Sequence, residues 1–224
     1  MGTLVLFSDF TENDNTDFKN SVRKLFSNKK YILTYIASMT DIVLKYYKMN
    51  KESLSEYGDF EFHYLDIDEF YNPDNIEELF KSDVIYLSGG NTYYFLNNLK
   101  KRNLLNRLRI YVQNGGCIFG LSAGAIMMSK DIVVSQFGDE NIVGLTDLSS
   151  LDLVDFDFMP HWNQDSRYLN ALKEYTENTG RICYICNDGD GIIIKDNETK
   201  FYGNIKIIEN GRFNDISEGN LPPL

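Results

Sequence analysis

Segments with strand character and segments with helix character alternate along the first half of this chain, and no other feature of the sequence constrains the fold as strongly. The strand-like runs lie at 3–7, 30–36, 60–67, 83–87 and 117–119, and the helix-like runs at 18–25, 41–51, 76–81, 92–99 and 104–114. An alternation of this kind is typical of parallel sheets connected by helical crossovers. It predicts an α/β fold built on a doubly wound, mostly parallel sheet with helices on both faces.

The last third of the chain turns to β structure. Runs at 182–186, 191–195 and 204–208 have strand character, and we expect them to extend the sheet or to form edge hairpins. With 224 residues, 43% of them apolar, the chain can bury a full core. No linker, internal repeat or low-complexity tract interrupts it, so we predict one α/β domain over residues 1–224.

The segment GLSAG at 120–124 directly follows an apolar strand-like run. A serine between glycines at a strand-to-helix turn is how many hydrolases expose a nucleophile. The glycines are needed because the backbone there is strained, and any side chain would collide with the neighbouring strand or helix. Ser122 is therefore our candidate nucleophile, although glycine-rich turns also occur simply to permit close packing.

A second glycine turn, SGGNT at 88–92, follows the strand-like run 83–87. The carboxyl ends of parallel strands share one edge of a sheet, where open α/β sheets bind ligands. The backbone N–H groups of Gly90 and Ala123 could therefore converge on one oxygen and form an oxyanion hole. The alternative is that the glycines only turn the chain into a helix capped by Asn91 or Thr92.

A serine nucleophile needs a base, and the chain contains two histidines. His63 lies within an alternating strand pattern upstream of both glycine turns, and we assign it a structural role. His161 follows an apolar stretch and Pro160, a proline that ends regular strand pairing. Catalytic side chains are usually presented at such positions, so His161 is the candidate general base.

The base needs an acidic group to hold its ring, and the segment NDGDG at 187–191 offers two. Asp188 is our candidate because it comes at the end of the incoming strand, whereas Asp190 lies between two glycines like a turn residue. An ordinary hairpin or a fragment of a calcium-binding loop would look similar. An EF-hand is excluded, because no glutamate closes a twelve-residue loop and no helices flank it.

Taken in order, the motifs GGNT, GLSAGA, PH and the Asp-Gly turn resemble the serine peptidases of the dipeptidase E family, and cyanophycinase more distantly. The resemblance spans most of the chain. It implies a flavodoxin-like fold similar to that of class I glutamine amidotransferases, with a serine in place of their cysteine. It also implies a triad of Ser122, His161 and Asp188 with Gly90 and Ala123 as the oxyanion hole. Dipeptidase E has a glutamate where Asp188 stands, and the shorter aspartate reaches less far.

Substrate choice is less constrained. Dipeptidase E carries after its histidine an extended polar loop that ends in an arginine for the substrate's aspartate, whereas the loop after His161 is short. Arg167 is the nearby cation and follows Asp165, so it could bind a substrate carboxylate or pair on the surface. We take Arg167 and Asn91 as candidate substrate-binding residues, and we expect aspartyl specificity to be weak or absent.

Charge and composition exclude several classes of partner. A net charge of −11 argues against nucleic acid and anionic membranes, and no apolar run approaches the length of a membrane span. The start of the sequence lacks the basic region of a signal peptide, and three cysteines suit a reducing compartment, so we expect a cytoplasmic protein. Cys183 and Cys186 fall on opposite faces of a strand, which speaks against zinc. We predict no metal and no cofactor.

Two functions remain open at this stage. The first is a serine hydrolase that cleaves a small peptide, acting as a monomer or a homodimer. The second is a catalytically inactive binding or regulatory module on the same scaffold, because a fold alone does not determine function. The joint presence of nucleophile, base and glycine turns favours the enzyme.

Overall fold

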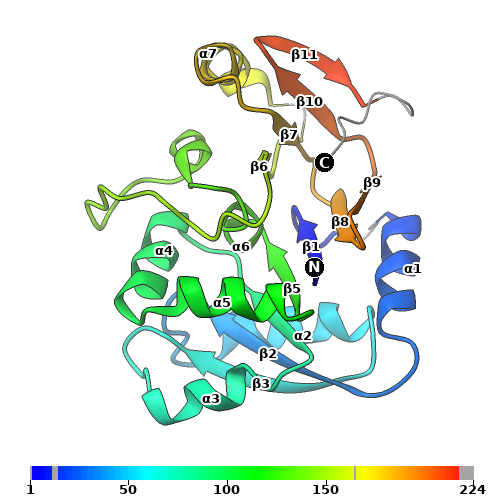
Figure 1. Cartoon of the computed structure of the whole chain (residues 1–224), viewed down its shortest axis with the longest axis vertical. Helices are drawn as coiled ribbons and strands as arrows, with labels where there is room; N and C mark the ends of the chain where they lie inside the picture. Colours follow the sequence, from blue (N-terminus) through cyan, green and yellow to red (C-terminus); the bar gives the residue numbers. More distant parts are fainter. Residues whose placement is uncertain (1, 12–14, 164, 217–224) are drawn as a thin grey trace.

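A large mixed sheet forms the centre of the computed structural model, which describes residues 2–11, 15–163 and 165–216 (Figure 1). Its strand order is β3-β2-β4-β5-β1-β8-β9. The strands are β1 (Thr3–Phe7), β2 (Tyr31–Ala37), β3 (Phe60–Asp66), β4 (Val84–Leu87), β5 (Cys117–Leu121), β8 (Gly191–Lys195) and β9 (Glu198–Tyr202). Neighbours from β3 to β1 pair in parallel, and β8 and β9 pair antiparallel. The predicted doubly wound, mostly parallel sheet is confirmed.

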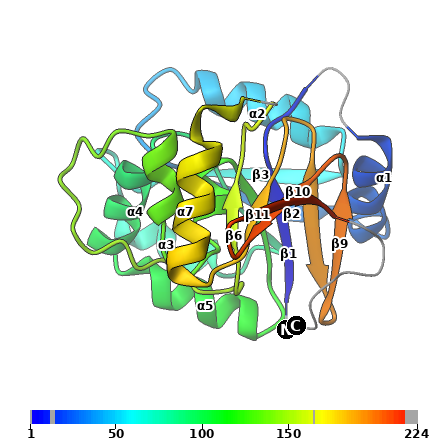
Figure 2. The same cartoon turned by 90° about the horizontal axis from the view of Figure 1, so that it is seen from above.

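Helices cover both faces of this sheet because its inner strands are apolar on both sides. In β1, Leu4 and Leu6 pack into one hydrophobic cluster, and Val5 and Phe7 pack into another on the opposite face. Figure 2 shows α2 and α5 on opposite sides of the sheet. The helices are α1 (Thr16–Leu25), α2 (Lys45–Ser55), α3 (Ile76–Leu79), α4 (Thr92–Lys101), α5 (Leu104–Gln113), α6 (Ala123–Ile126) and α7 (Leu169–Thr179), with short 3₁₀ helices η1 (Pro73–Asn75), η2 (Val133–Phe137) and η3 (Ser166–Tyr168).

A second, smaller sheet lies beside the first and carries α7 at the top of Figure 1. Its strand order is β11-β10-β7-β6, from β6 (Asp157–Met159), β7 (Cys183–Ile185), β10 (Lys206–Glu209) and β11 (Arg212–Asp215). The predicted C-terminal β extension is therefore divided between two sheets, since only β8 and β9 extend the central one. The acidic turn at 187–190 carries the chain from the small sheet into the large one and does not close a hairpin.

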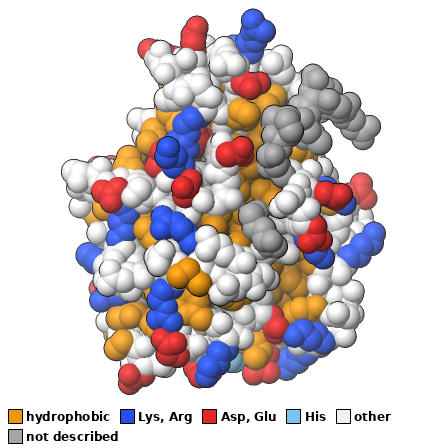
Figure 3. All heavy atoms as spheres, in the orientation of Figure 1, with side chains coloured by type: hydrophobic (Ala, Val, Ile, Leu, Met, Phe, Trp, Pro, Cys, Tyr) orange, Lys and Arg blue, Asp and Glu red, His pale blue; other side chains and the backbone are white. Residues whose placement is uncertain are grey.

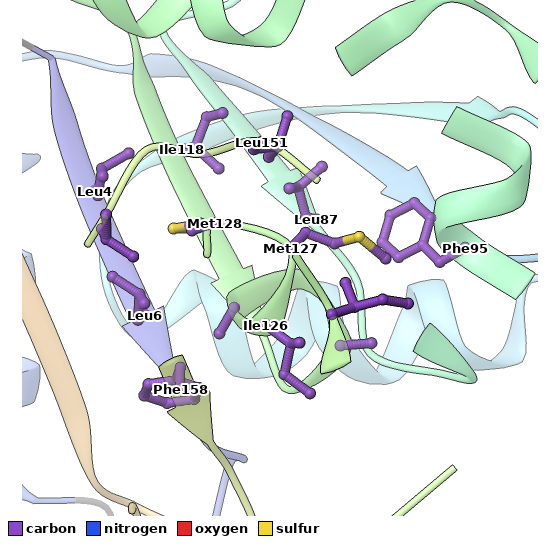
Figure 4. Packing of buried hydrophobic residues seen from close by; sticks show 14 of the residues in the cluster. Leu4, Leu6, Leu87, Phe95, Ile118, Ile126, Met127, Met128, Leu151 and Phe158 are labelled. Carbon is purple, nitrogen blue, oxygen red and sulfur yellow. The ribbon is translucent and has the colours of Figure 1, made fainter. Parts of the chain in front are cut away.

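One continuous apolar cluster joins the two sheets. Figure 4 shows Leu6 of β1, Ile118 of β5 and Phe158 of β6 around Met128, which follows α6. All four side chains are fully buried. This packing fixes the small sheet against the edge of the large sheet where the parallel strands end.

The surface drawn in Figure 3 carries lysine and arginine side chains interspersed with aspartate and glutamate. Among the described residues, no helix is both long enough and apolar enough to cross a membrane.

Candidate active site

The site lies where β1, β4 and β5 end side by side. Strand β5 pairs with β1 on one side and β4 on the other, with Leu121 opposite Phe7 and Gly120 opposite Leu87. The segments that follow these three strands therefore leave the sheet at one edge. Ser8 follows β1, the Gly89–Gly90 turn follows β4, and Ser122 follows β5.

Ser122 has the strained backbone expected of a nucleophile at a strand-to-helix turn. Its φ is 50° and its ψ is −109°, and its N–H donates to the Phe7 carbonyl at 2.9 Å. A Cβ on Gly120 would lie 2.4 Å from the Gly124 carbonyl oxygen, and a Cβ on Gly124 would lie 2.1 Å from the Leu87 carbonyl oxygen. Glycine is required at both positions, as the sequence predicts.

His161 lies within hydrogen-bond distance of Ser122. The Nε2 atom of His161 is 2.7 Å from Ser122 Oγ, so the predicted approach of these two side chains is confirmed. His161 lies on the loop that follows β6, and its backbone φ is 58°. By contrast, His63 lies on β3 at the edge of the large sheet, and its Nε2 atom is 3.4 Å from Glu61 Oε1.

The two aspartates of the acidic turn point in different directions. Asp188 Oδ1 is 2.7 Å from His161 Nδ1, so the aspartate reaches the imidazole in spite of its short side chain. The buried Asp190 side chain accepts hydrogen bonds from the backbone and side-chain amides of Asn187 and from the Asn204 backbone. Burial also raises the pKa of the Asp190 carboxyl. Asp190 stabilises the turn, and Asp188 contacts the imidazole.

The two glycine turns approach each other around Ser122. A Cβ on Gly89 would lie 3.6 Å from Ser122 Cβ, and Gly90 lines the same cavity as Ser122. Ala123 is the first residue of α6. Within the described part of the chain, neither the Gly90 nor the Ala123 amide donates a hydrogen bond to another group. Both amides are therefore free to donate to a bound oxygen.

Asn91 is engaged in local structure. Its Oδ1 accepts from the Tyr94 N–H at 2.9 Å and so caps α4, and its Nδ2 donates to the Glu140 carbonyl at 2.8 Å. The helix-capping alternative for this residue is thus what the structure contains. Gly90 and Thr92, on either side of Asn91, line the cavity.

A cavity of about 410 Å³ opens beside Ser122 and His161. Part of its wall comes from η2 and the residues after it, a segment that the sequence analysis did not connect with the site. That wall supplies Val134, Ser135, Phe137, Gly138 and Asp139. The loop after His161 is short, as expected, but a second wall with polar groups is present because the connection at 127–156 provides it.

Arg167 also lines the cavity, but it is not a free cation. Its Nε donates to Asp165 Oδ2 at 2.5 Å, its guanidinium lies 5.5 Å from the ring of Tyr168, and 74% of its side chain is exposed. The surface ion pair that the sequence left open is therefore formed. Asp139 and Asp165 place two carboxylates in the wall beside this one arginine.

Two residues that the sequence analysis missed, Ser8 and Asn163, contact the Asp188 carboxylate. Ser8 Oγ donates to Asp188 Oδ1 at 3.2 Å and accepts from the backbone N–H of His161 at 2.9 Å. Asn163 Nδ2 donates to Asp188 Oδ2 at 2.6 Å, and Asn163 Oδ1 accepts from the Asp188 N–H at 2.8 Å. The one available signal was position, since Ser8 directly follows a strand that ends at the site.

Asp9 is a further acidic residue close to His161 and Asp188. Asp9, His161 and Asp188 offer potential metal-ligand atoms that all lie within 4.8 Å of one another. His161 Nδ1 and Asp188 Oδ1 are, however, hydrogen-bonded to each other, which is the arrangement of an acid–base pair. The absence of a metal cofactor stays a prediction.

A model of peptidase family S51 matches residues 4–202, which is most of the chain. The chain belongs to this family. It is 33% identical to an uncharacterized peptidase of Listeria monocytogenes over 124 residues, which cover 54% of this chain and 60% of the relative. Over 92 residues it is 32% identical to peptidase E of Shewanella sp. strain ANA-3, covering 41% of this chain and 38% of the relative. The match thus spans about 60% or less of the length of these curated relatives.

Two solved structures resemble the family S51 fold of this chain. A candidate peptidase E from Listeria monocytogenes superimposes with a TM-score of 0.72 at 27% identity, covering 90% of this chain and 98% of the other. A peptidase from an acI-B1 Actinobacterium also gives a TM-score of 0.72, at 18% identity, covering 98% and 96%. The second likeness concerns the fold alone.

Proposed function

We propose that this protein is a serine peptidase of the peptidase E type that hydrolyses short peptides. The observation that carries the proposal is the continuous hydrogen-bonded series from Ser122 through His161 to Asp188, which opens on a cavity. Membership of peptidase family S51 supports it. An inactive binding module has no physical need for such a series.

Each residue has a distinct role in the proposed reaction. Ser122 Oγ attacks the peptide carbonyl while its proton passes to His161 Nε2, and Asp188 keeps the other ring nitrogen protonated and facing it. The amides of Gly90 and Ala123 donate to the oxyanion. When the C–N bond breaks, His161 gives the proton to the leaving amine. A water molecule then attacks the acyl-enzyme by the same route and releases the new carboxylate.

The substrate is a short peptide in this proposal because the cavity is small. A volume of about 410 Å³ lies at the lower end of the usual range for small-ligand sites. Arg167 adds little selectivity for an acidic side chain, since Asp165 already engages it. Asn91 acts on the substrate only indirectly, by fixing the turn that presents Gly90.

Our proposals for the location and assembly of the protein rest on its composition. We place the protein in the cytoplasm because its three cysteines are free and buried, as suits a reducing compartment. We also retain one domain, a monomer or homodimer, and no nucleic-acid or membrane partner.

The test is the variant Ser122→Ala. Labelling by a fluorophosphonate and hydrolysis of a dipeptide and tripeptide library should both be lost, with kcat falling on the order of a millionfold. Ser129→Ala is the matched control, because Ser129 is a fully buried serine outside the cavity lining. If folded wild-type protein neither reacts with the probe nor cleaves any peptide, the inactive module is the better description.

A further inference from the structure

The Asp188 carboxylate is surrounded by donors that do not line the cavity. Ser8 donates to one oxygen and Asn163 to the other, while His161 Nδ1 shares the oxygen that Ser8 contacts. Ser8 is fully buried and Asp188 is 27% exposed. Because an aspartate side chain can rotate about two bonds, these donors fix the orientation in which the carboxylate meets the imidazole.

The Asn163 contact is reciprocal, and this fixes its direction. The Asp188 N–H donates to Asn163 Oδ1, so the Asn163 NH₂ group must be the end that faces the carboxylate. Asn163 has a φ of 41°, a left-handed conformation that asparagine tolerates better than most residues. The side chain is thus held in one orientation by backbone geometry and by two hydrogen bonds.

Ser8 links the base to the acid. The Ser8 hydroxyl accepts from the backbone N–H of His161 and donates to the Asp188 carboxylate, so one buried atom sets the position of both partners. The like-charged Asp9 also lies beside this pair, with a potential ligand atom within 4.8 Å of those of His161 and Asp188. Two donors on Asp188 offset the repulsion between the carboxylates.

We propose that Ser8 and Asn163 are positioning residues, which orient the Asp188 carboxylate so that His161 keeps its proton on Nδ1 and a free Nε2 for Ser122. The inference rests on the proposed peptidase function. In this proposal three residues together orient the imidazole, a role that a single longer acidic side chain could fill: the short Asp188 and the two donors that hold it.

The decisive experiment exchanges the carboxylate and the amide between positions 163 and 188. In Asp188→Asn, the Asn163 NH₂ group holds the new carbonyl oxygen, and the Ser8 hydroxyl can rotate to accept from the new NH₂ group instead of donating. That NH₂ group then faces His161 Nδ1 and forces the unproductive tautomer. In the double variant Asp188→Asn/Asn163→Asp, the carboxylate at 163 accepts from that NH₂ group. The carbonyl oxygen at 188 then turns to His161 and restores the productive tautomer.

We therefore expect Asn163→Asp to have opposite effects in the two backgrounds. In wild type it should lower kcat by at least about 10- to 100-fold, because it replaces a hydrogen bond to the Asp188 carboxylate by a second carboxylate that faces and repels it. In Asp188→Asn it should raise kcat by about tenfold or more. KM should stay within about twofold throughout, since neither residue lines the cavity.

Two matched variants control for general effects on folding. Asn197→Asp makes the same change at another left-handed asparagine, with a φ of 63°, in an exposed turn between β8 and β9. Ser8→Ala should lower kcat about tenfold with KM unchanged, whereas Ser129→Ala should leave kcat unaltered, because the buried Ser129 hydroxyl has no hydrogen-bond partner among the described residues. Thermal unfolding of every variant identifies any loss that is due to instability.

The outcomes separate this inference from the proposed function. If Asn163→Asp lowers kcat by the same factor in both backgrounds, Asn163 only holds its loop and the inference is wrong. If Ser8→Ala retains wild-type kcat, Ser8 has no positioning role. If wild type itself neither hydrolyses peptides nor reacts with a fluorophosphonate, the proposed peptidase function fails first.

Discussion

Replacing Asp188 by asparagine is expected to lower kcat by about 10⁴-fold, the loss that follows when a triad histidine is held in the wrong tautomer. The magnitude follows from contacts described above: Asn163 binds the new carbonyl oxygen, so an NH₂ group must face His161 Nδ1. The folded state should lose about 1 kcal/mol or less, because the side chain is partly exposed and keeps its Asn163 contact.

The substitution Asp190→Asn should have the opposite effects, lowering the stability of the folded state and leaving kcat nearly unchanged. Asp190 accepts hydrogen bonds on both oxygens, two from Asn187 and one from the Asn204 N–H. An asparagine there leaves at least one of these donors facing an NH₂ group, which costs about 1–3 kcal/mol. Removing a buried charge offsets part of this cost. The expected result is a lower free energy of unfolding with kcat within about threefold of wild type, since no hydrogen bond joins Asp190 to His161 in the described part of the chain.

The assay combines steady-state hydrolysis of the best library peptide with urea unfolding of both variants. Wild type and Asp196→Asn, a change on the exposed β8–β9 turn, provide the reference. If Asp190→Asn proves to be the variant that lowers kcat, while Asp188→Asn mainly lowers stability, the assignment of the acidic member to Asp188 is refuted.

Two further predictions concern specificity and pH. Arg167→Ala should change the preference for Asp-Leu over Leu-Leu in kcat/KM by less than about tenfold, because the exposed guanidinium is already paired with Asp165 and is screened by solvent. A wild-type preference of about a thousandfold that this variant removes would contradict this expectation. Burial raises the pKa of Asp157 to about 6 against the opposing effect of Arg181 and Tyr175, and about 3.9 is usual for an unfolded aspartate. The folded state therefore binds the proton of the Asp157 carboxyl more tightly than the unfolded state does. As the pH rises from about 4 to about 6, the contribution of Asp157 to the free energy of unfolding should fall by up to about 3 kcal/mol, measured by urea unfolding. The variant Asp157→Asn should show no such fall.

Local sequence rules predicted six of the seven strands of the central sheet, because each is a short apolar or alternating run bounded by turn residues. They missed the edge strand β9, whose residues are mostly polar. β1, β2, β4 and β8 fall within a residue of the expected bounds. The predicted runs at 182–186 and 204–208 overlap β7 and β10, but the same rules could not predict that these strands form a second sheet. β6 and β7 have three residues each, and their pairing joins segments far apart in the chain, so no local periodicity marks it.

The candidate site was predictable where function imposes an unusual local pattern. The glycines around Ser122 are required by close backbone approach, and Pro160 marks the strand end before His161. Ser8 and Asn163 carry no such mark, because serine and asparagine are ordinary loop residues until the fold brings them to Asp188. The cavity wall at 134–139 was missed for the same reason.

The position of β1 between β5 and β8 bears on how the chain acquires its site during folding. The end of this strand and the two residues after it hold all three candidate catalytic segments: the Phe7 carbonyl accepts from the Ser122 N–H, Ser8 contacts His161 and Asp188, and the Asp9 carbonyl accepts from the Gly189 N–H. Ser8 and Asp188 are 180 positions apart in sequence, and such distant contacts are slow to form. A newly made chain in which β1 has not yet inserted between β5 and β8 would therefore carry every reactive side chain without the arrangement that activates them.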